Sequence, residues 1–357
     1  MRLWVICFTP QGAALCRRLL HALPGDIQAQ GYGLGRFLSS GDEEIEKVGT
    51  SLSQWAQQAF EEAQSSKMGL LFIGACGIAV RAIAPYLKGK DVDPAVVVMD
   101  EKGQYAVSLL SGHLGGANGL ATVVAKTVGA VPVISTATDV NRTFAVDSFA
   151  AKNSLRVLEV PKIKLVSSAI LRGEPVGLYS QFPVLGEPPP VFAKSGVLAE
   201  KTETGVYIGF HPGENPFPQT VHLLPRLTLG LGCRRGVSCQ QIEEAVLAAL
   251  AAGGIAIEAV SQICSIVLKK DEEGILAFSQ KYALPILFFT AEQLLQAEPP
   301  QGQQFAASPF VSKITGVENV CERAAVLGSG GGRLYLPKRA HSGVTVAAAG
   351  KIQLQWE

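Results

Sequence analysis

Two short stretches of the sequence combine glycines with side chains that can move protons or donate hydrogen bonds. The first spans residues 108–118 and contains Ser111, Gly112, His113, Gly115, Gly116 and Asn118. An imidazole has an ordinary pKa near 6.5, so His113 is the predicted acid–base residue. The three glycines let a ligand approach the main chain, and their N–H groups are predicted to hold an anion or an oxyanion. The alternative is that His113 only caps a turn.

The second stretch, residues 134–141, places hydroxyl groups beside one carboxylate. Asp139 is predicted to orient His113 or a water molecule. Thr138 and Asn141 are predicted to contact the substrate, as are Ser111 and Asn118 of the first stretch. Residues of these types also build Asx and Ser/Thr turns, and that alternative stays open.

A third glycine turn, Gly74–Gly77, is followed by Arg81. It resembles a phosphate cradle only loosely, because neither the G-x-G-x-x-G nor the P-loop pattern is present. Arg81 is predicted to pair with a carboxylate of an anionic ligand, although a solvated surface charge is the alternative. The same role and the same alternative apply to Arg234, Arg235 and Lys338. Cys76 has no nucleophile signature and is expected to be a small buried thiol.

These side chains require a scaffold that ends its strands in glycine turns. Continuous apolar runs at 70–73 and 95–99 are typical of strands buried on both faces, and residues 78–87 between them have helical spacing. Residues 114–128 carry a second helical pattern, with Gly129 as the expected C-cap. The alternation predicts an α/β fold with parallel or mixed sheets flanked by helices, in which ligands bind at strand ends.

The length of 357 residues predicts a multidomain chain. We expect an N-terminal α/β domain at 1–146, a smaller α/β middle domain with linkers at 147–225, and a C-terminal α/β domain at 226–357. The middle region is set apart by its proline and glycine punctuation. In the C-terminal region, Ser238 is predicted to cap a long alanine-rich helix.

The composition excludes several classes of protein. Hydrophobic residues make up 48% and charged residues 17%, which is typical of a core-rich globular chain. A net charge of +1 gives no overall field for nucleic acid. The seven cysteines include no C-x-x-C pair, so we expect a reducing compartment, the cytoplasm, and no zinc site. No apolar run reaches the roughly 20 residues that a membrane span requires.

The order and spacing of four motifs resemble those of the CbiG family, the cobalt-precorrin-5A hydrolases of anaerobic cobalamin biosynthesis. These motifs are Gly74–Pro85, Asp93–Asp100, Ser108–Ala121 and Ser135–Asn141. Leu229–Gly236 and Leu336–Lys338 also resemble the C-terminal domain of that family, which is related to the cobalamin protein CobE.

The resemblance implies hydrolysis of the δ-lactone of cobalt-precorrin-5A, followed by loss of the methylated carbon C20 as acetaldehyde, to give cobalt-precorrin-5B. It implies an anionic tetrapyrrole as ligand and no cofactor or metal of the protein's own, because cobalt arrives within the substrate. Lactone opening requires an activated water and oxyanion donors, which the two polar stretches offer.

Several alternatives stay open at this point. A non-catalytic tetrapyrrole carrier would use the same arginines and glycine loops, and a methyltransferase of the same pathway would require S-adenosylmethionine. A homodimer and transient contacts with other corrin-pathway enzymes are also open. The site is expected in the first domain or, by preference, between the first and third, because domain interfaces commonly host such sites.

Overall fold

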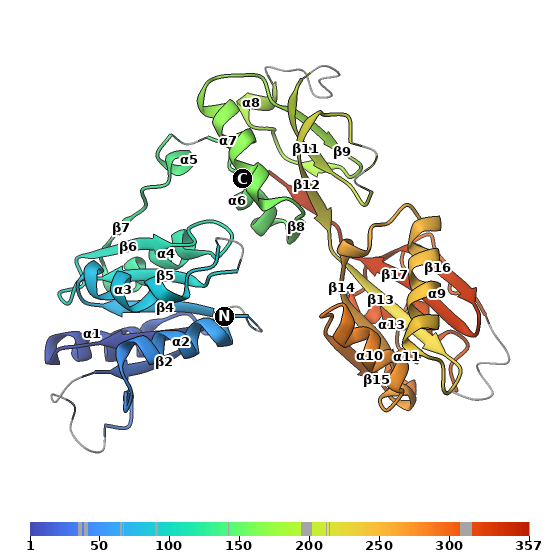
Figure 1. Cartoon of the computed structure of the whole chain (residues 1–357), viewed down its shortest axis with the longest axis horizontal. Coiled ribbons are helices and arrows are strands. Elements are labelled where there is room, and N and C mark those ends of the chain that lie inside the picture. The colour runs from blue at the N-terminus through green and yellow to red at the C-terminus, as the bar shows by residue number, and fades with distance from the viewer. Residues whose placement is uncertain are drawn as a thin grey trace. The chain divides into compact units, whose positions relative to one another are not determined.

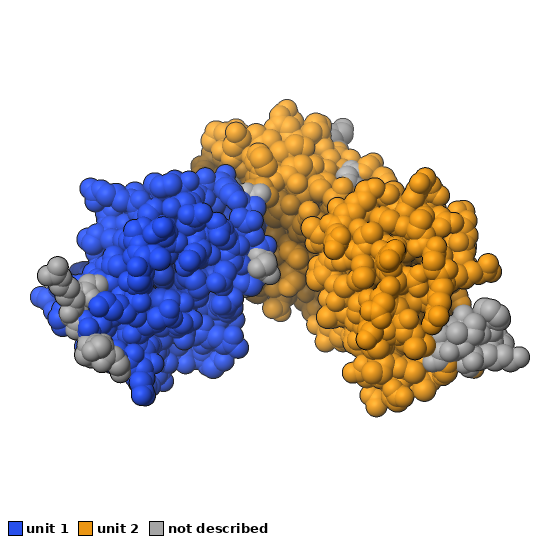
Figure 2. Space-filling model, turned by 60° about the horizontal axis from the view of Figure 1, so that its bottom comes forward, with its two compact units in different colours: residues 1–148 blue, residues 149–357 orange. Residues whose placement is uncertain are grey.

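The computed structural model of the chain describes residues 1–34, 38, 42–64, 66, 68–89, 92–141, 143–193, 202–211, 213, 215–307 and 316–356. The chain forms two compact units, Met1–Ser148 and Phe149–Glu357, which Figure 2 draws in blue and orange. Among the described residues, no helix has both the length and the apolar character that crossing a bilayer demands.

The N-terminal unit is built on a seven-stranded sheet in the order β3-β2-β1-β4-β5-β6-β7 (Figure 1). Its strands are β1 (Arg2–Cys7), β2 (Gln28–Gly33), β3 (Ile45–Lys47), β4 (Met68–Ile73), β5 (Ala95–Met99), β6 (Tyr105–Leu110) and β7 (Val131–Val133). Its helices are α1 (Pro10–Ala22), α2 (Leu52–Glu62), α3 (Cys76–Ile83), η1 (Ala84–Tyr86), α4 (Ala117–Val128) and α5 (Ala137–Val140), and α6 (Val146–Lys152) follows at its end.

Apolar side chains on both faces explain why β4 and β5 occupy the centre of this sheet. Every residue of the two strands is buried. Alternate side chains point to opposite faces of a strand, so Leu71 packs in the same cluster as α1 and α4, whereas Phe72 packs in the same cluster as α2 and α3. The prediction of doubly covered strands at these positions is confirmed.

The direction of β6 decides which loops meet. β6 is antiparallel to β5, while the other strand pairs of this sheet are parallel. Leu110, the last residue of β6, therefore lies opposite Val96 near the start of β5. The segments that follow β6 and β7 therefore leave the sheet at the end of the strands where β5 begins. Gly74–Gly77, which follows β4, lies at the opposite end of the strands, where β5 ends.

The second unit contains a four-stranded sheet in the order β8-β12-β11-β9 and a five-stranded sheet in the order β15-β14-β13-β17-β16. The first is formed by β8 (Leu155–Val157), β9 (Gly177–Ser180), β11 (Thr204–Ile208) and β12 (Gln219–Pro225), with η2 (Val160–Lys162), α7 (Ile163–Leu171) and α8 (Pro190–Ala193) nearby in sequence. A two-stranded sheet pairs β10 (Val184–Leu185) with β18 (Leu354–Gln355).

The five-stranded sheet is mixed, because β17 runs antiparallel to both of its neighbours. Its strands are β13 (Leu227–Cys233), β14 (Val260–Ile266), β15 (Ile286–Phe289), β16 (Arg333–His341) and β17 (Val344–Gly350). Around it are α9 (Cys239–Ala252), η4 (Ile257–Ala259), η5 (Val267–Lys269), α10 (Glu273–Lys281), α11 (Ala291–Leu295) and α13 (Val320–Gly328). The predicted cap of α9 is confirmed, since Ser238 and Gln241 form a capping box.

Mixed sheets flanked by helices confirm the predicted α/β class, while the three domain boundaries remain a prediction. Two local expectations need correction. The helix predicted from residue 114 begins at Ala117, because the chain first makes a turn that ends at Gly116, in the left-handed conformation at φ +89°. Its C-cap at Gly129 is confirmed. The expectation of a buried thiol at Cys76 is wrong, because Cys76 is exposed where α3 begins.

Candidate active site

His113 is held between two carboxylates. Its Nε2 lies 2.7 Å from Asp139 Oδ2 and its Nδ1 lies 2.9 Å from Asp147 Oδ1. His113 comes from the loop after β6, Asp139 from α5 after β7, and Asp147 from α6. The imidazole and the Asp147 carboxylate are each only 9% exposed, whereas the Asp139 carboxylate is 38% exposed. Asp139 is therefore the member of the trio that can meet a substrate.

The two carboxylates change the charge of the imidazole. Its hydrogen bond with Asp147 makes the largest contribution and, with Asp139, outweighs the opposing effect of burial, so the pKa of His113 rises from 6.5 to about 9. At neutral pH the ring is an imidazolium that donates through both nitrogens. Such a ring has no lone pair with which to accept a proton from water.

Asn118, in the first turn of α4, ties the two predicted stretches together. Its Nδ2 donates to Asp139 Oδ2 at 3.1 Å and to Thr136 Oγ1 at 3.1 Å. Its Oδ1 accepts from Ser108 Oγ at 2.7 Å. Oδ2 of Asp139 thus receives two N–H donors, while Oδ1 has no hydrogen-bond partner in the part of the chain that the structure describes.

The loop that carries His113 is held in an unusual conformation. Ser111 adopts φ +56°, a left-handed value that costs a serine free energy. A Cβ on Gly115 would lie 2.4 Å from Ser111 Cβ and 2.9 Å from the Ser111 carbonyl oxygen, so only glycine fits there. Strain of this kind is characteristic of functional sites.

Two buried hydroxyl groups near these residues in sequence have no hydrogen-bond partner in the described part of the chain. Ser111 and Thr138 are 8% and 7% exposed. Neither Ser111 Oγ nor Thr138 Oγ1 makes a hydrogen bond with any described residue. A buried hydroxyl without a partner costs free energy, so each is a position where a bound water or a ligand atom would be favourable.

The main-chain donors of the loop are only partly available. The N–H of Gly116 donates to the His113 carbonyl, and those of Ala117 and Asn118 donate to the carbonyls of Ser111 and Gly112. The N–H groups of Gly112 and Gly115 have no acceptor among the described residues. Of the three predicted glycine donors, Gly112 and Gly115 are thus the two that can serve a ligand.

The remaining predicted residues lie elsewhere. Arg81 is on α3, which begins at the opposite end of the strands from His113. Its guanidinium donates to the Gly77 carbonyl at 3.2 Å. Asn141 Nδ2 donates to the Ala137 carbonyl at 2.8 Å, so this side chain caps α5. Three belong to the second unit: Arg234 and Arg235, which are exposed after β13, and Lys338 on β16.

Asp147 is the residue of the trio that the sequence did not single out. It follows Phe144, Ala145 and Val146, all of which are buried. A carboxylate is rarely buried without a partner. The position of Asp147 at the end of an apolar run was therefore the one sequence feature that could have indicated a paired carboxylate.

Comparisons with known proteins agree along nearly the whole chain. Models of the cobalamin synthesis G family match in three parts: N-terminal (58–139), central region (144–225) and C-terminus (227–349). The chain is 32% identical to cobalt-precorrin-5A hydrolase of Priestia megaterium, over 97% of this chain and 94% of that protein. It is 34% identical to the enzyme of the same name from Salmonella typhimurium, over 96% and 95%. Protein CobE of a Sinorhizobium species is 31% identical over 39% of this chain and 89% of CobE.

Proposed function

This chain belongs to the cobalamin synthesis G family, and from that premise we propose that it is a cobalt-precorrin-5A hydrolase. Two relatives with that name, each matched over more than nine-tenths of both chains, support the assignment. In the proposed reaction, water opens the δ-lactone of the anionic tetrapyrrole. The methylated carbon C20 then leaves as acetaldehyde, and cobalt-precorrin-5B remains.

The observation that carries the mechanism is the anchored carboxylate of Asp139. Oδ2 is fixed by His113 and Asn118, while Oδ1 has no partner in the described part of the chain. In our proposal Oδ1 takes a proton from a water molecule as the water oxygen forms a bond to the lactone carbonyl carbon. The carbonyl oxygen becomes an oxyanion, for which the N–H groups of Gly112 and Gly115 are the proposed donors.

The proton then returns to the leaving oxygen. As the tetrahedral intermediate collapses, the ring C–O bond breaks and protonated Asp139 supplies the proton to the leaving oxygen. The products are a carboxylic acid, which gives up its proton to solvent at neutral pH, and a free hydroxyl on C20. Asp139, again a carboxylate, takes that hydroxyl proton, and the C–O bond becomes a carbonyl while the bond from C20 to the macrocycle breaks. The macrocycle takes the electron pair, and acetaldehyde is released.

His113 serves as a positioning residue in this scheme. As an imidazolium between Asp147 and Asp139, it fixes the orientation of the Asp139 carboxylate. This role differs from the direct acid–base role predicted from sequence, because both ring nitrogens are already engaged.

We further propose that no bound cofactor takes part, because the cobalt belongs to the substrate, and that the reaction occurs in the cytoplasm. Contacts between the substrate carboxylates and Arg234, Arg235 or Lys338 remain predictions. A homodimer and transient contacts with other enzymes of the pathway also remain predictions.

The test is anaerobic incubation with cobalt-precorrin-5A, with acetaldehyde as the readout. Asp139→Asn keeps the size of the side chain and removes its basicity, so we expect aldehyde release to fall by about 10²-fold or more. The matched control is Asp26→Asn, the same change at an exposed carboxylate of the same unit, which should retain full activity.

The outcomes separate the candidates. Release by the intact protein and by Asp26→Asn, but not by Asp139→Asn, supports both the reaction and the role of Asp139. Equal release by all three would remove Asp139 from the mechanism and leave the reaction standing. Tight binding of the tetrapyrrole without aldehyde from any of them would identify a carrier.

A further inference from the structure

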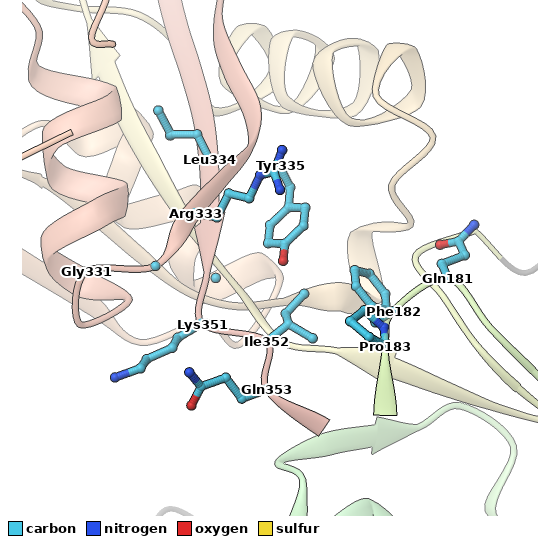
Figure 3. Close-up of a pocket in the computed structure, with 12 residues that line it drawn as sticks. Gln181, Phe182, Pro183, Gly331, Arg333, Leu334, Tyr335, Lys351, Ile352 and Gln353 are labelled. Atoms are coloured by element: carbon cyan, nitrogen blue, oxygen red, sulfur yellow. The ribbon is translucent and has the colours of Figure 1, made fainter. Parts of the chain in front are cut away.

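The second unit contains an open groove that the mechanism above does not use. It has a volume of about 720 Å³, within the usual range for sites that bind small molecules. Three segments line it: the turn Gln181–Pro183 after β9, the start of β16 with the two preceding glycines, and the chain from Gly350 to Gln353 at the end of β17. Figure 3 shows Tyr335, Phe182 and Ile352 gathered around this space.

The groove has an aromatic wall. The Tyr335 ring packs edge-on against Phe182 at 5.9 Å and Phe210 at 5.1 Å between ring centroids. Phe182 and Phe210 also pack edge-on, at 5.0 Å. Tyr335 and Phe182 are only half-buried, so part of this cluster is open to a ligand. Aromatic and aliphatic surface of this kind suits a large, flat, largely apolar ring.

A break in the strand accounts for the orientation of Tyr335. Leu334 pairs with Ala349 and Leu336 with Ala348, so Tyr335 is the extra residue of a β-bulge. Leu334 is buried in the cluster that contains Cys321, and Leu336 in the cluster that contains Val346. The inserted Tyr335 is only half-buried and lines the groove. Bulges often redirect a side chain toward a site. Burial raises the pKa of Tyr335, so its phenol keeps its proton at neutral pH, and no described residue is hydrogen-bonded to the hydroxyl.

The charge of the groove is positive. Among the described residues, its lining includes Arg333 and Lys351 and no carboxylate. Neither cation forms an ion pair with a residue that the structure describes. Two cations that have no ion-pair partner among the described residues, beside a half-buried aromatic wall, attract a ligand that carries carboxylates on an otherwise apolar body.

We propose that this groove is a binding site for a carboxylate-bearing tetrapyrrole ring. The macrocycle lies against Tyr335, Phe182 and Ile352, and its peripheral carboxylates pair with Arg333 and Lys351. The identity of the ring rests on the proposed function. The groove itself involves neither His113 nor Asp139, so ring binding here does not require the hydrolytic residues.

The test uses the full chain and cobyrinic acid, a stable cobalt corrin whose side chains are free carboxylic acids. Amide hydrogen exchange with and without this probe reports where it binds. We expect protection of Gly331–Tyr335 and Gly350–Gln353. In the double variant Arg333→Gln/Lys351→Gln that protection should be lost, and the dissociation constant should rise by about tenfold or more. The matched control Lys164→Gln/Lys270→Gln removes two exposed cations of the same unit and should behave as the parent protein.

Two further results complete the design. Tyr335→Ala should weaken binding as well, with thermal unfolding confirming that each variant is folded, whereas His113→Ala should keep protection of the groove. An absence of protection at both groove segments when the probe is saturating, or equal affinities of the two double variants, would overturn the inference. The acetaldehyde assay tests the proposed function separately, because a parent protein that releases aldehyde without protecting the groove refutes only the groove.

Discussion

His113 Nδ1 and Asp147 Oδ1 lie 2.9 Å apart, and both side chains are 9% exposed. A charged pair so well shielded from water interacts more strongly than an exposed one, which is why Asp147 has the largest effect on the pKa of His113. The pair fixes both the charge of the imidazole and the direction of its second nitrogen, which points at Asp139.

Replacement of Asp147 by asparagine should lower the pKa of His113 from about 9 toward 6.5, because the variant lacks the negative charge that stabilises the imidazolium. NMR titration of the His113 ring protons measures this directly. Asp26→Asn, at an exposed position, should leave the titration unchanged. A pKa that stays near 9 in Asp147→Asn would assign the shift to Asp139 instead.

The stability of the protein should fall as the pH rises from about 6.5 to about 9. The folded-state pKa of His113 is raised, so its contribution is fully present below the unfolded value of 6.5 and is lost as the pH passes about 9. We expect about 1 to 3 kcal/mol from this group. Urea unfolding across this range should show the loss in the parent protein and a smaller one in His113→Gln. Identical pH profiles would contradict the linkage.

Gly115→Ala should destabilise the protein by about 1 to 3 kcal/mol, because the new methyl group would overlap Ser111. Gly119→Ala is the matched control within the same segment. A Cβ at Gly119, in α4, meets no atom within 4 Å, so this change should stabilise the helix by about 0.5 to 1 kcal/mol. Thermal unfolding distinguishes the two, and equal shifts would show that the loop can move aside.

Ser111→Gly should make the protein more stable and less active. Glycine adopts φ +56° without strain, which is worth about 1 kcal/mol. The same change removes the buried hydroxyl that lacks a partner among the described residues, and we expect acetaldehyde release to fall.

Ser154→Gly provides the control for this prediction. Ser154 has a similar φ of +54° and is exposed, away from the trio in sequence. It should gain stability without losing activity. Full activity in Ser111→Gly would mean that the hydroxyl has no part in catalysis.

The sequence predicted the buried central strands of the N-terminal sheet well, but it did not predict the direction of β6. The runs at 70–73 and 95–99 are apolar at every position, a pattern typical of a strand covered on both faces. Periodicity does not encode strand direction, however, because the pattern is the same in either sense. The antiparallel direction of β6 therefore could not be predicted. As a result, Arg81 was grouped with His113 and Asp139, which lie at the other end of the strands.

The sequence predicted two members of the candidate site, His113 and Asp139, and missed the third, Asp147. His113 and Asp139 stood out because they follow predicted strands among glycines and hydroxyls, and ligands bind at strand ends in open α/β sheets. Asp147 did not, because its role depends on how the chain folds back after α5 and not on its neighbours in sequence. The positive charge of His113 follows from that tertiary contact and has no counterpart in the sequence pattern.

The reversed direction of β6 also has a practical consequence. Cys76 is the most exposed thiol of the seven, since four of the others are buried and two are half-buried. It lies where α3 begins, at the opposite end of the strands from the loop that carries His113. A fluorophore attached through the native thiol would therefore report on the N-terminal unit during turnover without occupying the space around Asp139, and no engineered cysteine would be needed.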